Sequence, residues 1–255
     1  LIEVKAISIN PVDVRTRAGS AMAEFLKKEM PLILGWDISG IVVEVGKQVS
    51  KFKTGDAVFG MVNFLGHGKG YAEYVAASEN HITKKPENIS FEEAATATLA
   101  ALTAWQFLIN DAKIKKGDKV LVLAASGGVG HFAVQIAKYF GAYVIGLASS
   151  KNKDFVLSLG ADEYISYDKQ EVTELVNDVD IVIDPFAKEN LEKSLGLTKS
   201  GGVIISLLPM IAEEIKEKAK EKNVKISYSL VDSNGEDMKQ LAELIENGII
   251  KPHVS

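Results

Sequence analysis

Residues Leu121–Gly130 read LVLAASGGVG, an apolar run that ends in a glycine-rich turn. The turn has the pattern A-x-G-x-x-G, with Ala125 where the usual fingerprint has its first glycine. Gly127 and Gly128 leave room for a pyrophosphate beside the backbone N–H groups, and Gly130 allows close helix–strand packing. Such a turn can also bind nothing, but a preceding strand and a following helix favour dinucleotide binding. The predicted binding residues are Ala125, Ser126, Gly127, Gly128, Val129 and Gly130.

Strands and helices alternate around this turn. The expected strands are Lys119–Ala124, Tyr143–Leu147, Glu163–Ile165, Asp180–Asp184, Gly202–Leu207 and Lys225–Leu230. The expected helices are Gly128–Phe140, Asn152–Leu159, Glu189–Leu197, Ala212–Lys222 and Glu236–Asn247. Runs such as VLVLA and DIVID are apolar throughout, as in parallel strands that helices cover on both faces. This half of the chain therefore predicts a six-stranded doubly wound α/β domain.

Residues 1–90 have a different pattern, in which short β-type runs are separated by turns rich in Gly, Pro and Asn. The expected strands are Ile2–Ile9, Asp37–Val45, Ala57–Val62 and Ala72–Ala76. This pattern predicts a β-rich unit. Ser90 and Glu93 have the spacing of a capping box, which predicts a helix from there to about Asn110.

The composition excludes several classes of function. The chain has 255 residues, 29 Lys plus Arg, 34 Asp plus Glu and a net charge of −5, so nothing indicates nucleic-acid binding. It has no cysteine, which excludes disulfides, thiolate metal sites and a cysteine nucleophile. No apolar run is long enough to span a bilayer. No signal peptide is visible either, and we expect a cytoplasmic protein.

The segment Gly146–Asp154, GLASSKNKD, bears on which dinucleotide binds. An NAD site would place an acid at the end of the second strand, roughly 20 residues past the glycines. Here Ser149, Ser150 and Lys151 follow that strand, and no acid precedes Asp154. Hydroxyls and an ammonium group would bind a 2′-phosphate, whereas a carboxylate would repel it. The segment predicts NADPH, although the serines could equally serve as the N-cap of a helix.

Six motifs occur in the same order as in zinc-free members of the medium-chain dehydrogenase/reductase superfamily, and the chain most resembles NADPH-dependent quinone oxidoreductases. They are NPVD (Asn10–Asp13), GWDISG (Gly35–Gly40), KTGDAVFG (Lys53–Gly60), GYAEYV (Gly70–Val75), LAALTAW (Leu99–Trp105) and AASGGVGHFAVQIAK (Ala124–Lys138). The resemblance implies a GroES-like β-barrel catalytic domain and a six-stranded Rossmann domain. The expected ranges are 1–92, 93–248 and, for the start of a return to the catalytic domain, 249–255. We also expect that native residues are missing at both ends.

The same resemblance implies roles for four residues. It places Asn10 beside the nicotinamide, with its amide donating to a substrate oxygen, and it lets Asp13 orient Asn10. It places Thr103 against the nicotinamide and Tyr167 near the 2′-phosphate. The residues alone allow plainer interpretations, namely a turn at Asn10, a short helix capped by Asp13, a threonine buried in a helix and a loop tyrosine.

The resemblance also bears on a metal. Zinc-dependent relatives carry a cysteine and a histidine at the positions of Asn10 and Trp36, and neither residue here is a zinc ligand. We therefore expect no metal. In the segment Pro185–Asn190, close relatives carry a glycine pair where Ala187 and Lys188 stand, which leaves the shape of the pocket open.

The predicted function is metal-free hydride transfer from NADPH to a quinone or an electron-poor conjugated carbonyl. The alternatives are a 2-alkenal or enoyl C=C reductase, a non-catalytic NADPH-binding or sensor protein, and a reductive domain of a larger synthase. A homodimer that pairs Rossmann edges is possible, with Lys225–Leu230 as the candidate edge strand.

Overall fold

The computed structural model describes residues 1–27, 31–186, 189–209 and 211–254. Backbone contacts divide the chain into two compact units, one formed by Leu1–Leu102 with Val231–Ser255 and the other by Thr103–Leu230. The expected ranges 1–92, 93–248 and 249–255 stay a prediction. Helix α10 (Gly235–Glu246) packs on strand β5 (Thr83–Lys84) of the first unit. In the described part of the chain, no helix combines the length and apolar character needed to cross a bilayer.

The first unit is built on an antiparallel five-stranded sheet with the order β4-β1-β2-β3-β5. Its other strands are β1 (Ile2–Ile7), β2 (Asp37–Val42), β3 (Ala57–Met61) and β4 (Tyr74–Val75). The buried core consists of Ile2, Ile38, Val42, Val58, Val62, Val75 and Ile82. The expected β-rich unit is confirmed, and β5 is an additional strand of two residues.

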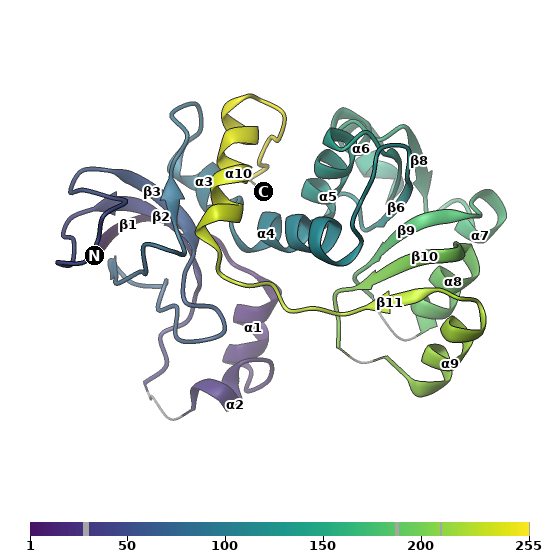
Figure 1. Cartoon of the computed structure of the whole chain (residues 1–255), viewed down its shortest axis with the longest axis horizontal. Coiled ribbons are helices and arrows are strands. Elements are labelled where there is room, and N and C mark those ends of the chain that lie inside the picture. Colours follow the sequence, from purple (N-terminus) through teal and green to yellow (C-terminus); the bar gives the residue numbers. More distant parts are fainter. Residues whose placement is uncertain (28–30, 187–188, 210, 255) are drawn as a thin grey trace. The chain divides into compact units, whose positions relative to one another are not determined.

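The first unit also contains short helices, which Figure 1 labels along the chain. These are α1 (Pro11–Arg17), α2 (Ala23–Leu26) and α3 (Phe91–Thr96), and α4 (Leu99–Gln106) crosses the division between the units. The capping box of α3 is confirmed, because the Glu93 N–H donates to Ser90 Oγ at 3.1 Å and the Ser90 N–H donates to Glu93 Oε2 at 2.8 Å.

The single helix expected from Ser90 to Asn110 is wrong, because it is interrupted after Thr96. The backbone leaves the helical region at Ala97, and the Leu99 N–H donates to Asp37 Oδ1 at 3.0 Å. A carboxylate from β2 thus starts a separate helix at α4. The remainder, Phe107–Asp111, is a π-helical turn.

The second unit is a parallel six-stranded sheet, as predicted. Its strands are β6 (Lys119–Leu123), β7 (Tyr143–Ala148), β8 (Glu163–Ser166), β9 (Val179–Asp184), β10 (Thr198–Ser206) and β11 (Lys225–Ser227). Their order, β11-β10-β9-β6-β7-β8, is that of the doubly wound dinucleotide fold. The chain starts at β6, moves outward to β8 and returns to β9 on the other side of β6. Ligands bind at the carboxyl ends of the strands where the direction of winding reverses, between β6 and β9.

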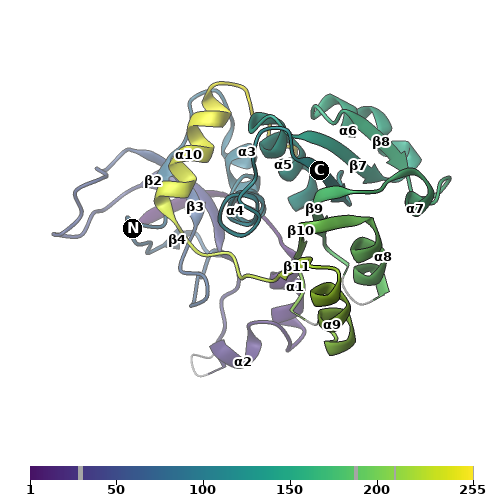
Figure 2. The same cartoon turned by 45° about the vertical axis from the view of Figure 1, so that its right-hand side comes forward.

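Helices cover both faces of this sheet because its crossovers run in two directions. Right-handed crossovers place α5 (Gly128–Tyr139) and α6 (Lys153–Ser158) on one face, and α8 (Glu189–Leu197) and α9 (Glu213–Glu221) on the other. Figure 2 shows α8 and α9 beside β10 and β11. The buried core contains Leu121, Ile145, Val182, Leu191 and Ile204 among others.

Some boundaries differ from the prediction. Strand β10 begins at Thr198 rather than Gly202, with a register shift against β9, and β11 ends at Ser227 rather than Leu230. The one-turn helix α7 (Val172–Leu175) was not predicted. Strand β11 is an edge of the described sheet, and a homodimer through this edge stays a prediction. The expected departure from the glycine pair of close relatives, in the 185–190 loop, concerns Ala187 and Lys188. Both lie outside the described residues.

Candidate functional site

The glycine-rich turn connects β6 to α5 at the carboxyl edge of the parallel sheet. The Gly127 N–H donates to the Ala124 carbonyl at 2.8 Å, which closes the turn, and the His131 N–H donates to the Gly127 carbonyl at 3.0 Å, which starts the helix. Ala125 is buried. The first N–H groups of α5 have no acceptor within the helix, so the turn offers donors and a positive dipole end to an anion.

The two glycines of the fingerprint have different structural roles. A Cβ atom at Gly130 would lie 2.1 Å from the Ala124 carbonyl oxygen, so the close approach of helix and strand requires glycine there. A Cβ atom at Gly127 would lie 3.2 Å from the same oxygen, which is tight but tolerable. Packing within the chain therefore accounts for Gly130 but only weakly for Gly127. A glycine at position 127 is consistent with a dinucleotide that approaches the backbone closely.

The segment after β7 contacts the glycine-rich turn through Asn152. The Asn152 side-chain amide donates to Ser126 Oγ at 2.8 Å and to Ser149 Oγ at 3.2 Å. The Tyr164 hydroxyl donates to the Ser149 carbonyl at 2.6 Å. The structure thus brings together Ser126 and Ser149 from the two predicted parts of the nucleotide site. Sequence reasoning passed over Asn152, although it lies next to Lys151 in the segment SSKN.

An acid that sequence reasoning missed lies at the same place. The Ser150 N–H donates to Asp168 Oδ1 at 2.8 Å, and Ser150 Oγ donates to Asp168 Oδ2 at 2.7 Å. Ser166 Oγ also donates to Asp168 Oδ1, at 2.6 Å. The dinucleotide-binding fingerprint includes an acid only at the end of the second strand, which is β7 here. Because β7 and β8 are parallel neighbours, the residues after β8 reach the same edge of the sheet.

In the first unit, Asn10 is the N-cap residue of α1 and is almost fully buried. Its backbone N–H donates to Asp13 Oδ2 at 2.7 Å, whereas its side-chain amide donates to Asp37 Oδ2 at 2.6 Å. Asp13 therefore holds the backbone of Asn10, and Asp37 sets the direction of its side chain. Sequence reasoning included Asp37 only as part of a motif and gave it no role.

Burial dominates the electrostatics around Asn10. Asp13 and Asp37 are 2% and 1% exposed. Burial and, to a smaller extent, the charge of Asp13 together raise the pKa of Asp37 to about 7, against the opposing effect of its hydrogen bonds. Burial also raises the pKa of Asp13 above its usual range. Burial and the charge of Asp13 raise the pKa of the Tyr71 hydroxyl. Burial thus shifts the acidic groups around Asn10 towards their protonated forms.

The other predicted site residues belong to the second unit. Thr103 lies on α4 and is buried. Lys151 and Tyr167 are exposed, and Tyr167 follows β8 directly. Asn10 and Asp13 thus belong to one unit, and Thr103 and the predicted nucleotide-binding residues belong to the other.

The residues at the zinc-ligand positions of relatives do not fit that metal. The Asn10 amide is bonded to Asp37, and the Trp36 indole N–H donates to the Gly66 carbonyl at 2.8 Å. The Trp36 ring also packs edge-on against Phe64. In the described ranges, no three His, Cys, Asp or Glu side chains are grouped so that they could hold a metal ion.

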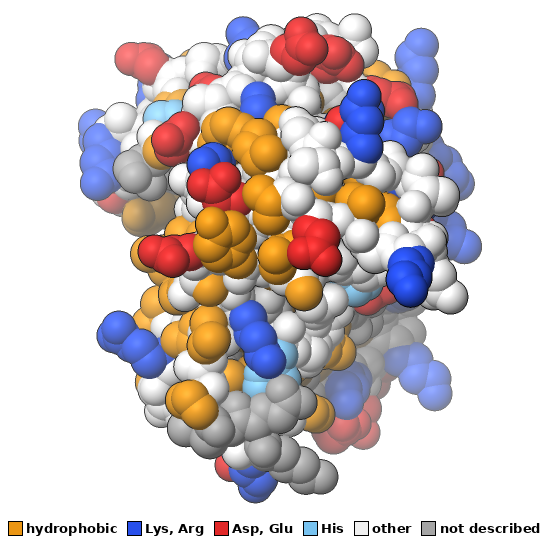
Figure 3. All heavy atoms as spheres, turned by 90° about the vertical axis from the view of Figure 1, so that its left-hand side faces the viewer, with side chains coloured by type: hydrophobic (Ala, Val, Ile, Leu, Met, Phe, Trp, Pro, Cys, Tyr) orange, Lys and Arg blue, Asp and Glu red, His pale blue; other side chains and the backbone are white. Residues whose placement is uncertain are grey.

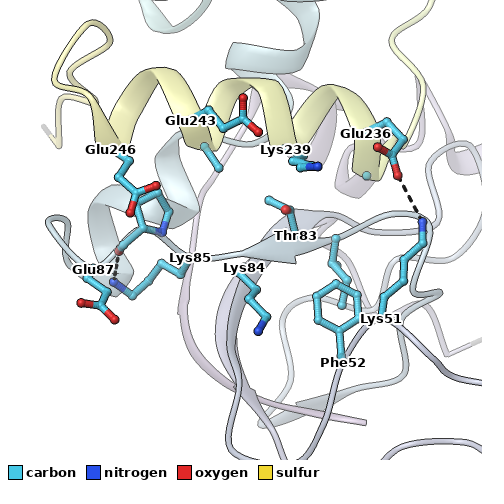
Figure 4. A pocket seen from close by; sticks show the side chains of 14 residues that line it. Lys51, Phe52, Thr83, Lys84, Lys85, Glu87, Glu236, Lys239, Glu243 and Glu246 are labelled. Carbon is cyan, nitrogen blue, oxygen red and sulfur yellow. Dashed lines mark hydrogen bonds and ion pairs between the residues drawn. The ribbon is translucent and has the colours of Figure 1, made fainter.

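A cavity of about 550 Å³ lies between α10 and β5 and is not the predicted site (Figure 4). Its walls carry acidic and basic side chains, including an ion pair of 3.3 Å between Lys51 and Glu236. None of the predicted site residues lines it. Figure 3 views the side of β1–β3 and shows acidic, basic and apolar side chains interspersed among the coloured residues, without a continuous basic patch on that face.

Comparison with known proteins identifies both units. Residues 1–87 match the alcohol dehydrogenase GroES-like domain, and residues 128–247 match the zinc-binding dehydrogenase family. The chain is 36% identical to the quinone oxidoreductase of Mus musculus over 98% of its own length and 77% of the relative's. It is also 36% identical to the 2-methylene-furan-3-one reductase of Solanum lycopersicum, over 99% of its own length but only 63% of the relative's.

Solved structures give the same result. The quinone oxidoreductase of Coxiella burnetii is 39% identical, with a TM-score of 0.91, and the match covers 100% of this chain and 80% of the other. The quinone oxidoreductase of Escherichia coli complexed with NADPH is 27% identical, with a TM-score of 0.84 and coverage of 100% and 81%.

A GroES-like unit joined to a doubly wound sheet with a glycine-rich turn defines a class of two-domain oxidoreductases that use a nicotinamide dinucleotide. The chain belongs to the medium-chain dehydrogenase/reductase superfamily and is quinone oxidoreductase-like.

Proposed function

We propose that the protein transfers hydride from NADPH to a quinone or to an electron-poor conjugated carbonyl compound. The observation that carries the proposal is the glycine-rich turn at the switch point of the parallel sheet, where a Cβ atom at position 130 would clash with the backbone but packing explains the glycine at position 127 only weakly. The quinone oxidoreductase relatives support the acceptor class, and the Escherichia coli structure with NADPH supports the cofactor.

When bound, the dihydronicotinamide supplies the hydride, and the acceptor becomes an oxyanion whose charge is delocalised. Asn10 has a second side-chain N–H besides the one donated to Asp37, and this second N–H would donate to the substrate oxygen. Asp37 keeps the amide in one orientation, and Asp13 holds the backbone beneath it. We propose that Thr103 contacts the nicotinamide and that the six residues 125–130 bind the pyrophosphate.

This proposal is tested by stopped-flow absorbance of the nicotinamide band. We expect NADPH to be oxidised in single turnovers with a panel of quinones and enones. If NADPH binds but no member of the panel oxidises it, the chain is a non-catalytic nucleotide-binding protein instead. The Asn10→Ala variant should reduce the rate of hydride transfer by about tenfold to a thousandfold, with nearly unchanged affinity for NADPH.

The 2′-phosphate is assigned to Ser149, Ser150, Lys151 and Tyr167. Lys151 is the cation of this set; it follows Ser150 in the chain and is exposed. We expect that Lys151→Glu removes the preference for NADPH over NADH, because an attractive charge becomes a repulsive one. The measurement is the ratio of the two dissociation constants, with Lys153→Glu as a control of equal charge change. An unchanged ratio in Lys151→Glu would refute the assignment.

The second candidate is reduction of a C=C bond conjugated to a carbonyl, as in a 2-alkenal or enoyl reductase. The name of the tomato relative, a 2-methylene-furan-3-one reductase, favours it. Product analysis separates the two activities, because an enone reduced at carbon keeps its carbonyl whereas a quinone becomes a hydroquinone.

A further inference from the structure

Asp168 holds together the ends of two neighbouring strands of the second unit. In the parallel pair β7 and β8, Ala148 lies opposite Ser166. The chain after β7 therefore runs beside the chain after β8, and Asp168 bridges them. Its carboxylate accepts hydrogen bonds from the Ser150 N–H, Ser150 Oγ and Ser166 Oγ at 2.8, 2.7 and 2.6 Å.

These bonds use the donors that a 2′-phosphate would need. Ser150 has one backbone hydrogen and one hydroxyl hydrogen to donate, and both are directed at Asp168. The bonds from Ser166 and then Ser150 also hold the pKa of Asp168 below its usual range, so the carboxylate is charged at neutral pH. The Asp168 carboxylate thus accepts the hydrogen bonds that Ser150 would otherwise donate to the phosphate of a ligand.

We propose that Asp168 competes with the 2′-phosphate of NADPH for the donors of Ser150 and thereby limits the preference for NADPH over NADH. To bind the phosphate, Ser150 must release a carboxylate of like charge, and the repulsion between the two anions opposes binding. NADH carries a hydroxyl at the same position and meets no such opposition. The inference rests on the proposed use of NADPH, and it assigns to this chain a determinant that follows the third strand of the parallel unit, β8, rather than the second, β7.

The test uses ligands that report on this corner of the site alone. Adenosine 2′,5′-bisphosphate and AMP differ only in the 2′-phosphate, and calorimetric titration of the full chain gives a dissociation constant for each. We expect Asp168→Ala to increase the affinity for the bisphosphate relative to AMP by about tenfold, which corresponds to roughly 1.4 kcal/mol. Asp168 is exposed, so its removal leaves no cavity in the core.

Two further variants make the result specific. Asp168→Asn removes the charge but keeps an oxygen that accepts hydrogen bonds. We expect this variant also to increase the affinity for the bisphosphate relative to AMP. Asp178→Asn is the matched control, because Asp178 is an exposed acid that precedes β9 and so lies at the opposite, amino-terminal edge of the sheet. We expect the control to keep the wild-type ratio.

The outcomes separate the two proposals. If both ligands bind and neither Asp168 variant changes the ratio, or if Asp178→Asn changes it equally, Asp168 does not compete with the phosphate and this inference fails alone. If the unaltered chain binds neither ligand, the nucleotide site itself is refuted, and the proposed function falls with it.

Discussion

Gly130→Ala should destabilise the second unit by about 3 kcal/mol or more and abolish measurable dinucleotide binding. The new Cβ atom would lie 2.1 Å from the Ala124 carbonyl oxygen, which belongs to the backbone and cannot rotate away. The start of α5 must then move away from β6, and the N–H groups that we propose bind the pyrophosphate move with it. A loss of this size is a large part of the stability of an average domain.

The chain contains its own reporter for this measurement. It has two tryptophans, and Trp105 belongs to the second unit, where it is buried against Phe140 at 5.9 Å between ring centroids. In a Trp36→Phe background, denaturant unfolding followed by tryptophan fluorescence therefore reports on the second unit. Gly130→Ala should lower the midpoint of this transition strongly.

Gly127→Ala is the matched control. Its Cβ atom would lie 3.2 Å from the Ala124 carbonyl oxygen, and the backbone φ of −84° suits alanine, so stability should change by only about 1 kcal/mol. The methyl group would still push the pyrophosphate away from the N–H groups, and we expect an affinity loss of about tenfold to a hundredfold. Equal stability losses in the two variants would contradict the separate roles assigned to these glycines.

The second large effect is a pH dependence of stability that Asp37 imposes on the first unit. Its pKa is about 7 in the folded protein, against 3.8 for an unperturbed aspartate. The folded state therefore keeps a proton that the unfolded state releases as the pH rises from about 4 to about 7. Stability from this group is fully present below pH 4 and is lost as the pH rises through 7, by up to about 4 kcal/mol.

Comparison of the wild type with Asp37→Asn isolates this contribution. Other groups titrate in the same range, including His81, whose pKa burial lowers, but they are common to both proteins. We expect Asp37→Asn to lower the free energy of unfolding most near pH 4 and least at pH 8. Trp36, which is buried next to Asp37, reports on the first unit in a Trp105→Phe background. A difference in unfolding free energy that is constant between pH 4 and 8 would show that Asp37 is ionised in the folded state throughout.

The parts of the site that sequence reasoning found are encoded by residues close together in the chain. The glycine-rich turn spans six residues, and its spacing is sufficient to predict both the tight turn and the start of α5. The helix cap at Ser90 depends on a residue three positions away. The alternation of apolar strands with amphipathic helices is also local, and it predicted the six parallel strands.

The parts that were missed depend on contacts between distant residues. Asp37 bonds to Asn10, 27 residues away, and to Leu99, 62 residues away, and the second of these bonds breaks the helix expected from Ser90 to Asn110. Helix α10 packs on β5, about 150 positions earlier. Neither contact has a signature in the residues immediately around it.

Short-range periodicity and turn chemistry are sufficient to predict a β-rich unit and a doubly wound α/β unit with a glycine-rich turn, because neighbouring residues encode these features. The carboxylate that orients Asn10 and the acid that accepts hydrogen bonds from Ser150 become evident only from the three-dimensional fold. Pairing of β7 with β8 brings Asp168 to a serine 18 residues earlier. Strand pairing sets such contacts, and the spacing of residues along the chain does not reveal them.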